Sequence, residues 1–218
     1  YPATRSTLPN RQRDSKKGGW SLYKLCPHDL TLQKTAKLLI WNSRHEPVSM
    51  KLPPVFTEAC ERHLITPTSH CFLINVALQQ LTHYSGQNTK IFTVSTSING
   101  TGQKPGSFQT PLGLHKIHDK FGAGEPIGTV FKARKPIRRD GKGDPTALIT
   151  DRILWLEGLE PGINLGDSID SRKRYIYIHG VGDESALGKP NSQGCIHLAA
   201  SDLLPLFEIR PTGALVYI

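Results

Sequence analysis

The chain has 218 residues and a net charge of +9, with 37% hydrophobic and 21% charged residues. This length and composition predict a globular chain of one domain plus an appendage and exclude extensive disorder. No run of about eighteen consecutive apolar residues is present, so the sequence predicts no transmembrane helix.

Positive charge is concentrated in two segments. Residues 1–24 contain six Lys or Arg and one Asp, and residues 132–142 contain the same numbers. A basic surface attracts anionic partners such as nucleic acid, anionic lipid or an acidic wall polymer. No nucleic-acid-binding motif accompanies the charge, so we expect a solvated basic surface, weakly attracted to an anionic cell envelope, and no nucleic-acid partner.

Residues 1–68 are predicted to form a basic arm followed by a short helical extension. Residues 1–20 are polar and contain two prolines and a Gly-Gly pair, as is typical of a mobile arm. Residues 30–41 carry apolar side chains at helical spacing, and residues 57–64 form a second helical candidate with Thr57 as its N-cap. We expect this region either to pack onto the following domain or to cover a substrate groove.

From position 69 onward, short strands predominate. Apolar or β-branched runs bounded by turn residues predict strands over residues 71–77, 90–95, 114–118, 147–156, 175–179 and 214–218. Residues 83–88 have the composition of a turn, which predicts a hairpin of the first two strands. Many short strands and little helix predict that residues 69–218 form a mostly β domain, a sandwich or a partial barrel.

One helix is expected late in this domain, over residues 203–208. Ser201 or Asp202 lies near its predicted cap, and Pro205 is expected to limit it to one or two turns.

Two residues near the end of the chain have the chemistry of a nucleophile pair. Tyr175, Tyr177 and His179 alternate with isoleucines, so the imidazole is predicted at the end of a strand whose other face is core. Cys195 follows directly after Gly194. A thiolate is the reactive form of cysteine, and a neighbouring imidazole makes it available near neutral pH.

This region resembles the signature of the YkuD-type L,D-transpeptidases, which are cysteine enzymes of bacterial peptidoglycan. The resemblance is carried by His179-Gly180, by Gly188, and by the run Ser192-x-Gly194-Cys195-Ile196. Upstream, residues 107–113 resemble the family's Thr-Pro-x-Gly segment, and residues 72–81 resemble its opening strand and turn. The likeness therefore covers residues 69–218 and leaves the first 68 residues outside.

The resemblance implies a β-rich catalytic domain with acyl transfer through a thioester. Cys195 would be the nucleophile and His179 its base, with the carbonyl of Gly180 orienting the imidazole. Gly194 lets the backbone approach closely, so that the Cys195 amide is able to face the oxyanion of a tetrahedral intermediate.

The implied substrate is a peptidoglycan tetrapeptide stem, cut after its third residue with release of D-alanine. The acceptor would be the side-chain amine of another stem or a free D-amino acid, and carbapenems should acylate the thiol. We assign Tyr177, Ser192, Gln193 and His197 to substrate binding, although Ser192 is equally compatible with a turn role. The implied protein is a monomer of the periplasm or cell envelope, exported by a signal that this sequence does not contain.

Two positions depart from the family's pattern. Gln193 stands where the family usually has His, and His197 stands where it usually has Arg or Asn. A neutral imidazole would bind a substrate carboxylate less firmly than Arg, which binds it through two parallel hydrogen bonds. One of Arg172, Lys173 or Arg174 is a candidate to replace it.

Other readings of the same residues remain open. With water as the acceptor, the enzyme would be an L,D-carboxypeptidase or a wall amidase, and without turnover it would be a peptidoglycan-binding module. A zinc site would draw on His115, His118, His179, Cys195 and His197. Because a strand places the first two on opposite faces, we expect no metal, and the resemblance implies no cofactor.

The other three cysteines lack CxxC spacing, which excludes a zinc ribbon and a dense disulfide scaffold. In an exported protein, Cys26, Cys60 and Cys71 would be able to supply one disulfide. Otherwise they are expected to be buried or idle thiols.

Overall fold

The structure is a computed structural model that describes residues 50–209 and 212–218. The predicted arm over residues 1–20 and the predicted helix over residues 30–41 lie outside this part. The chain divides into two compact units, residues 1–46 and 47–218, and every element below belongs to the second unit. None of the described helices is long and apolar enough to cross a membrane.

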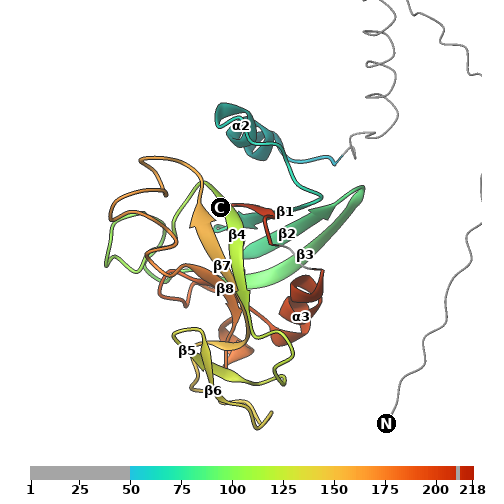
Figure 1. The fold of residues 1–218 in the computed structure, drawn as a ribbon, viewed down its shortest axis with the longest axis vertical. Helices are drawn as coiled ribbons and strands as arrows, with labels where there is room; N and C mark the ends of the chain where they lie inside the picture. Colours follow the sequence, from blue (N-terminus) through green and yellow to red (C-terminus); the bar gives the residue numbers. More distant parts are fainter. Residues whose placement is uncertain (1–49, 210–211) are drawn as a thin grey trace, which may run out of the picture. The chain divides into compact units, whose positions relative to one another are not determined.

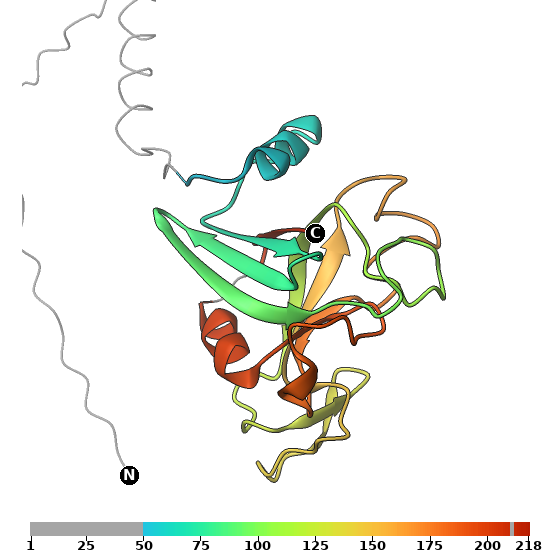
Figure 2. The same ribbon diagram turned by 180° about the vertical axis from the view of Figure 1, so that it is seen from behind.

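The described residues form a single sheet of ten strands (Figure 1 and Figure 2). The strands are β1 (His70–Asn75), β2 (Gln80–Ser85), β3 (Asn88–Ser95), β4 (Leu114–Phe121), β5 (Val130–Lys132), β6 (Lys135–Arg138), β7 (Thr150–Gly158), β8 (Tyr177–Gly180), β9 (Ile196–Leu198) and β10 (Leu215–Tyr217). Their order is β4-β10-β1-β2-β3-β9-β8-β7-β5-β6, and β4 also pairs with β7. This second pairing closes the sheet into a barrel, with the β5–β6 hairpin extending from β7. The predicted mostly β, partial-barrel fold is confirmed.

The predicted hairpin of the first two strands is wrong, because β2 lies between them. It pairs antiparallel with β1 on one side and with β3 on the other. The tight turn falls at Gly86 and Gln87, where Gly86 has a φ of 57°. Of the residues of β2, only Leu81 is fully buried. The segment therefore shows little of the apolar pattern that marks a strand in sequence.

Helix α2 (Pro54–Arg62) begins three residues earlier than expected. Pro53 is the N-cap and Pro54 opens the first turn, where proline is tolerated because the first amides have no partner within the helix. Thr57 is therefore inside the helix and not its N-cap, and its hydroxyl donates to the carbonyl of Pro54 at 2.9 Å. The helix packs onto the barrel through the buried side chain of Phe56, whose ring centroid lies 5.9 Å from that of Tyr217. Packing onto the domain is thus the role that this segment shows, and the domain division at residue 68 stays a prediction.

Helix α3 (Ala200–Glu208) is also longer than expected. Its N-cap is Ala199, so neither Ser201 nor Asp202 caps it. Pro205 lies within the helix and does not end it, since the carbonyl that loses its amide partner belongs to the exposed first turn. Three of its side chains, Leu203, Leu206 and Phe207, enter the core.

The main core fills the barrel. Its buried side chains include Phe72, Phe92, Ile117, Leu154, Leu156, Ile178, Ile196, Leu198, Leu203 and Phe207. A second cluster joins α2 to β1 and β10, and it contains Cys60 and Cys71 as free, buried thiols. Burial raises the pKa of both thiols, and that of Cys60 reaches about 11. Cys26 lies outside the described residues.

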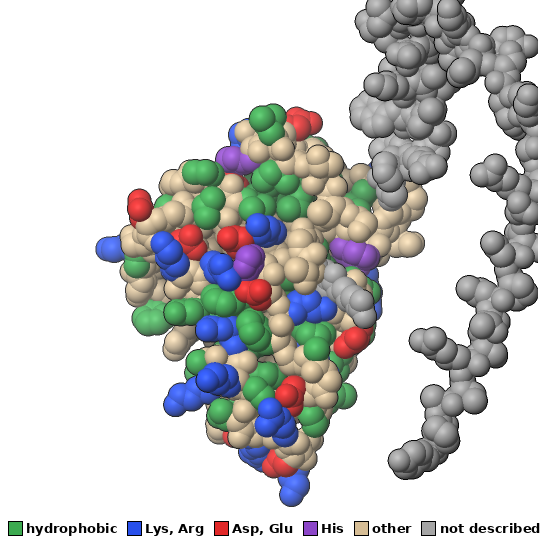
Figure 3. Space-filling view, viewed as in Figure 1, with side chains coloured by type: hydrophobic (Ala, Val, Ile, Leu, Met, Phe, Trp, Pro, Cys, Tyr) green, Lys and Arg blue, Asp and Glu red, His purple; other side chains and the backbone are tan. Residues whose placement is uncertain are grey.

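The basic segment 132–142 forms the β5–β6 hairpin and the loop after it. In Figure 3, Lys and Arg side chains gather over this hairpin at the lower end of the molecule. Arg138 pairs with Asp140 and Asp144, and Arg139 pairs with Glu125. Part of this charge is therefore neutralised on the surface.

Candidate active site

The site is organised by two parallel neighbours, β8 and β9. In their register, Ile178 lies opposite Ile196 and His179 lies opposite His197. Cys195 comes one residue before β9 and is therefore level with Tyr177. Because side chains alternate between faces, Cys195 and His197 point to the same side of the sheet as Tyr177 and His179. The pairing brings the thiol and the imidazole together, although they lie far apart in sequence.

These side chains line one cavity of about 330 Å³. All six of the predicted non-glycine site residues line it, namely Tyr177, His179, Ser192, Gln193, Cys195 and His197. Arg174, one of the three candidate carboxylate anchors, also lines it, and five residues to which the sequence assigned no role complete the wall: Phe108, Leu148, Ile149, Tyr175 and Asn191. Of these five, Phe108 lies in the family-like segment 107–113, and Tyr175 begins the predicted strand 175–179, on the same face as Tyr177 and His179.

His179 is buried and held in one tautomer. Its Nδ1 donates to the carbonyl of Gly180 at 2.7 Å, and since a carbonyl only accepts, the proton resides on Nδ1. Nε2 is left as the acceptor. Burial, and then the neighbouring His197, lower the pKa of His179 to about 3, against the opposing effect of the Gly180 hydrogen bond. The imidazole is therefore neutral near neutral pH, with Nε2 unprotonated.

Gly180 has no room for a side chain. A Cβ at this position would lie 2.5 Å from Oδ2 of Asp151 and 2.9 Å from the carbonyl of Thr150. Asp151 itself adopts a φ of 62° at an irregularity between β7 and β8. Its buried carboxylate accepts hydrogen bonds from the amide of Gly128 at 2.7 Å and the hydroxyl of Thr150 at 2.6 Å. The carboxylate thus fixes the backbone behind His179.

The turn before Cys195 is shaped by Gly194 and Ser192. Gly194 has a φ of 111°, and a Cβ there would lie 3.2 Å from the carbonyl of Gln109. The Ser192 hydroxyl donates to the carbonyl of Cys195 at 2.5 Å and accepts from the amide of Gly194 at 3.2 Å. This buried hydroxyl is committed to the turn, which supports the structural reading of Ser192.

Among the hydrogen bonds of the described residues, none uses the amide of Cys195. The amide of Gly194, by contrast, donates to Ser192. The Cys195 amide is therefore one donor in this turn that is available to an oxyanion.

The thiol of Cys195 is held as a neutral group. It donates to the carbonyl of Tyr175 at 3.5 Å. Burial raises the pKa of the Cys195 thiol to about 11, although a hydrogen bond with the backbone of Tyr177 and the nearby positive charge of Arg174 oppose the shift. With His179 also neutral, the pair is a thiol beside an imidazole base and not a preformed thiolate–imidazolium pair.

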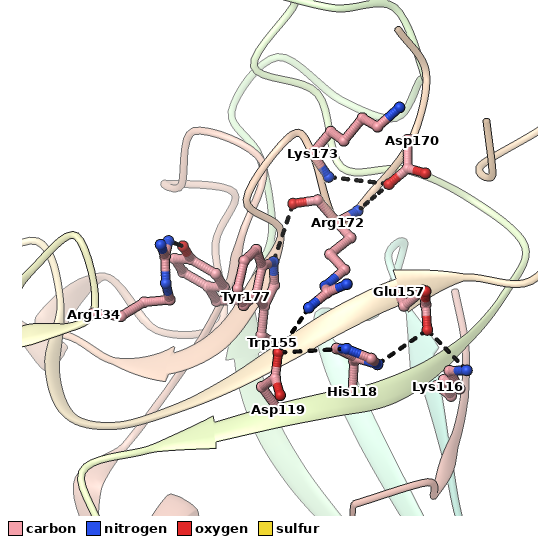
Figure 4. A network of polar contacts seen from close by, with 10 residues as sticks. All are labelled: Lys116, His118, Asp119, Arg134, Trp155, Glu157, Asp170, Arg172, Lys173 and Tyr177. Carbon is pink, nitrogen blue, oxygen red and sulfur yellow. Dashed lines mark hydrogen bonds and ion pairs between the residues drawn. The ribbon is translucent and has the colours of Figure 1, made fainter. Parts of the chain in front are cut away.

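Tyr177 forms the wall of the cavity next to His179, with its ring edge-on to the imidazole at 6.3 Å between centroids. Its hydroxyl accepts from Nη1 of Arg134 at 2.8 Å (Figure 4). Arg134 lies at the turn of the β5–β6 hairpin with a φ of 66°, next to Ala133 with a φ of 46°. Its guanidinium also stacks 4.4 Å from the ring centroid of Trp155. Arg134 thus links the strained turn of the β5–β6 hairpin to Tyr177 in the cavity wall.

The three basic residues considered as carboxylate anchors diverge. Figure 4 shows Arg172 directed toward Trp155 and Asp119, with Nη2 3.2 Å from the Asp119 carboxylate, and Lys173 directed away from them. Arg174 lines the cavity, and its Nη1 and Nη2 donate to the carbonyls of Gly102 and Gln109. Arg172 is therefore committed elsewhere, and Arg174 is the candidate adjacent to Cys195.

The residues of the zinc reading are not all gathered at one site, because His115 and His118 lie away from the cavity that His179, Cys195 and His197 line. His115 is fully buried, bonded to the carbonyl of Gly113 at 2.9 Å and the hydroxyl of Ser171 at 3.0 Å. His118 instead lies 3.1 Å from Glu157 in the surface ion network of Figure 4. In the described ranges, no group of three or more metal-binding side chains comes together.

The fold and this arrangement define a Cys–His site on a closed, mostly β domain. The family model of the L,D-transpeptidase catalytic domain, YkuD, matches residues 70–218. The chain belongs to this family. No curated protein matches the chain.

Several solved structures are similar to it at low identity. An L,D-transpeptidase from Mycobacterium smegmatis is 15% identical over 68% of this chain and 58% of that chain, with a TM-score of 0.41. L,D-transpeptidase 3 from Mycobacterium tuberculosis, in complex with a faropenem-derived adduct, is 15% identical over 68% and 59%, with a TM-score of 0.42. The Enterococcus faecium L,D-transpeptidase is 13% identical over 69% and 50%, with a TM-score of 0.43. This chain thus spans less than two thirds of each of these chains.

Proposed function

We propose that the protein is a peptidoglycan L,D-transpeptidase that acts through a Cys–His thioester mechanism. The observation that carries this proposal is the register of β8 and β9, which brings Cys195 and His179 to one cavity. The hydrogen bond from His179 to Gly180 leaves Nε2 free to act as a base. Membership of the family supports the substrate, a tetrapeptide stem.

In the proposed reaction, Nε2 of His179 takes the proton of the Cys195 thiol as the sulfur attacks the carbonyl carbon of the scissile peptide bond. The Cys195 amide donates to the resulting oxyanion. The C–N bond breaks, and the departing D-alanine nitrogen takes the proton from His179. A thioester remains. An acceptor amine then attacks it, passes a proton to His179, and restores the thiol as a new peptide bond forms.

Three further parts of the proposal rest on the family alone. Carbapenems acylate Cys195, the protein works as a monomer, and it resides in the periplasm or cell envelope. Each is open to a direct measurement: mass spectrometry of the acylated protein, sedimentation, and fractionation of cells.

The test is mass spectrometry of purified tetrapeptide muropeptides after incubation with the protein. Transpeptidation predicts loss of D-alanine together with cross-linked dimers, and Cys195→Ala should abolish both. His179→Ala should slow acylation of Cys195 by a factor of about 100 to 10,000, the usual contribution of a general base. Full activity of His179→Ala would refute the mechanism.

Other outcomes select the other readings. Loss of D-alanine with monomers alone would identify an L,D-carboxypeptidase or a related hydrolase that uses water. Binding of muropeptides by both the wild type and Cys195→Ala, without any turnover, would identify a peptidoglycan-binding module.

A further inference from the structure

A second cavity, of about 410 Å³, lies beside the one that holds Cys195. The two cavities share Phe108, Arg174 and Gln193 in their walls. They are therefore neighbours, and a group bound in the second cavity is next to the nucleophile. Nothing in the Cys–His mechanism uses the second cavity.

Two cations line this cavity without a carboxylate partner. Among the described residues, neither Lys173 nor Arg174 forms an ion pair. Arg174 donates to two carbonyls, those of Gly102 and Gln109, at 3.1 and 2.6 Å. A guanidinium has five N–H donors, so three remain for a ligand. A half-buried guanidinium without a counter-charge favours an anionic ligand, and its planar fork fits a carboxylate.

One carboxylate also lines the cavity. Asp167 is exposed, and in the described part of the chain it forms no ion pair or side-chain hydrogen bond. It adopts a φ of 44°, a conformation that a non-glycine residue rarely takes. The cavity therefore presents both signs of charge to one ligand.

The loop that presents these charges is ordered from within by Asp170. Its carboxylate accepts from the amides of Arg172 and Lys173 at 2.9 and 3.0 Å (Figure 4), and from the amide of Gly166 at 3.3 Å. Asp170 is itself buried. Asp167 and Lys173 thus belong to one loop whose backbone is fixed by Asp170. This order lowers the entropy cost of binding a ligand between the two side chains.

We propose that the second cavity binds an α-amino-acid head group. Its carboxylate is held by Arg174 and Lys173, and its ammonium by Asp167. The inference deepens the proposed function and rests on it for the source of the head group, which is either a free amino acid or the side chain of a stem peptide. In both cases an amino-acid group is held beside the site of acyl transfer.

Arg174 also has a structural role that the test must separate. Through the carbonyl of Gln109 it braces the backbone against which Gly194 packs. A substitution of Arg174 that only loosened this backbone would weaken every ligand equally. Loss of a carboxylate contact would weaken only ligands that carry a carboxylate.

The experiment is an NMR titration of the full chain with D-alanine, D-alaninamide and N-acetyl-D-alanine. The last two lack the carboxylate and the ammonium, respectively. We expect saturable shifts at the amides of residues 167, 173 and 174 with D-alanine, and at least about tenfold weaker binding of each analogue, as for loss of a charged hydrogen bond. Equal binding of all three ligands, or shifts elsewhere only, would overturn the proposal.

Substitutions of the three charged residues test which of them contacts the carboxylate of the ligand and which contacts its ammonium. Arg174→Gln should bind D-alanine as weakly as D-alaninamide, with Arg174→Lys intermediate, and Asp167→Asn should remove the preference over N-acetyl-D-alanine. Lys173→Gln, at an exposed position, tests the carboxylate contact without disturbing the brace, and Lys135→Gln on β6 is the matched control with wild-type binding. If Arg174→Gln weakens all three ligands equally while Lys173→Gln binds them as the wild type does, Arg174 only supports the backbone at Gln109 and does not bind the carboxylate.

Two further readouts complete the test. If a tetrapeptide stem displaces D-alanine only while its side-chain amine is free, the head group belongs to the stem; if neither the free nor the acetylated stem displaces it, the cavity takes a separate amino acid. The titration does not require turnover. If the protein binds D-alanine in this cavity but releases none from muropeptides, the proposed function is disproved and the proposed binding site still stands.

Discussion

His179 and His197 face each other across the parallel strands β8 and β9, with their ring centroids 4.9 Å apart. Burial lowers the pKa of His197 to about 4, and burial together with His197 lowers that of His179 to about 3. A second proton between these rings is disfavoured because two like charges would share one desolvated site. Both rings are neutral near pH 7, so Nε2 of His179 is unprotonated and available to accept the proton of Cys195 in the proposed reaction.

The first prediction concerns the reactivity of Cys195 toward iodoacetamide. Because burial raises the pKa of this thiol to about 11, the thiolate fraction should grow about tenfold with each pH unit between 7 and 9. The alkylation rate, followed by mass spectrometry, should grow in proportion. Cys195→Ser identifies any signal from the other three cysteines, Cys26, Cys60 and Cys71. A rate that is already constant from pH 6 upward would show a preformed thiolate–imidazolium pair instead.

The second prediction concerns Gly180, whose carbonyl orients His179. In Gly180→Ala, the new Cβ would meet the Asp151 carboxylate and the carbonyl of Thr150, so the backbone must shift. We expect a loss of about 1–3 kcal/mol in the free energy of unfolding, measured in urea, and a large loss of Cys195 acylation.

The matched control is Gly162→Ala. This position has a φ of 74° but open space around its Cα. The variant should lose about 1 kcal/mol from backbone strain and keep wild-type acylation. Equal acylation rates in the two variants would mean that the Gly180 carbonyl does not orient the base.

The candidate pair was predictable because its signals are local. The alternation of Tyr177, Ile178 and His179 is visible within three residues, and Gly194 directly precedes Cys195. What brings them together was not predictable, because β9 is only three residues long. A strand of that length has no measurable period, and its pairing partner is chosen by the closure of the barrel.

The supporting residues were missed for the same physical reason. Asp151 acts on Gly180 only through an irregular register between β7 and β8, which no local pattern encodes. Arg134 was visible only as one charge in a basic run, yet it contacts Trp155 and Tyr177. Both contacts depend on long-range strand pairing, so they follow from the fold and not from composition.

The third prediction tests Arg134 as a positioning residue. Arg134→Lys keeps the charge but loses the planar guanidinium that stacks on Trp155 and donates to Tyr177. We expect a loss of about 1 kcal/mol in the free energy of unfolding and a several-fold rise in KM for tetrapeptide stems, with kcat nearly unchanged. Lys135→Gln, in the adjacent position, should behave as the wild type. A fall in kcat at constant KM would instead connect Arg134 to the chemical step.

The last prediction follows from His115, which is fully buried and neutral. Burial lowers its pKa to about 4, whereas an unfolded histidine has a pKa of about 6.5. Between these values the unfolded chain binds a proton that the folded chain does not, so stability rises with pH and falls as the solution is acidified. His115 changes the free energy of unfolding by on the order of 1.4 kcal/mol per pH unit in this range, and this pH dependence vanishes above about pH 6.5.

His115→Gln should be less stable than the wild type at pH 7. Its free energy of unfolding should fall less steeply between pH 6 and 4.5, measured by urea unfolding at each pH. The difference between the two proteins should stay constant from pH 7 to 8, which serves as the internal control. Parallel declines in the acid range would show that His115 takes up its proton in the folded domain as readily as in the unfolded chain.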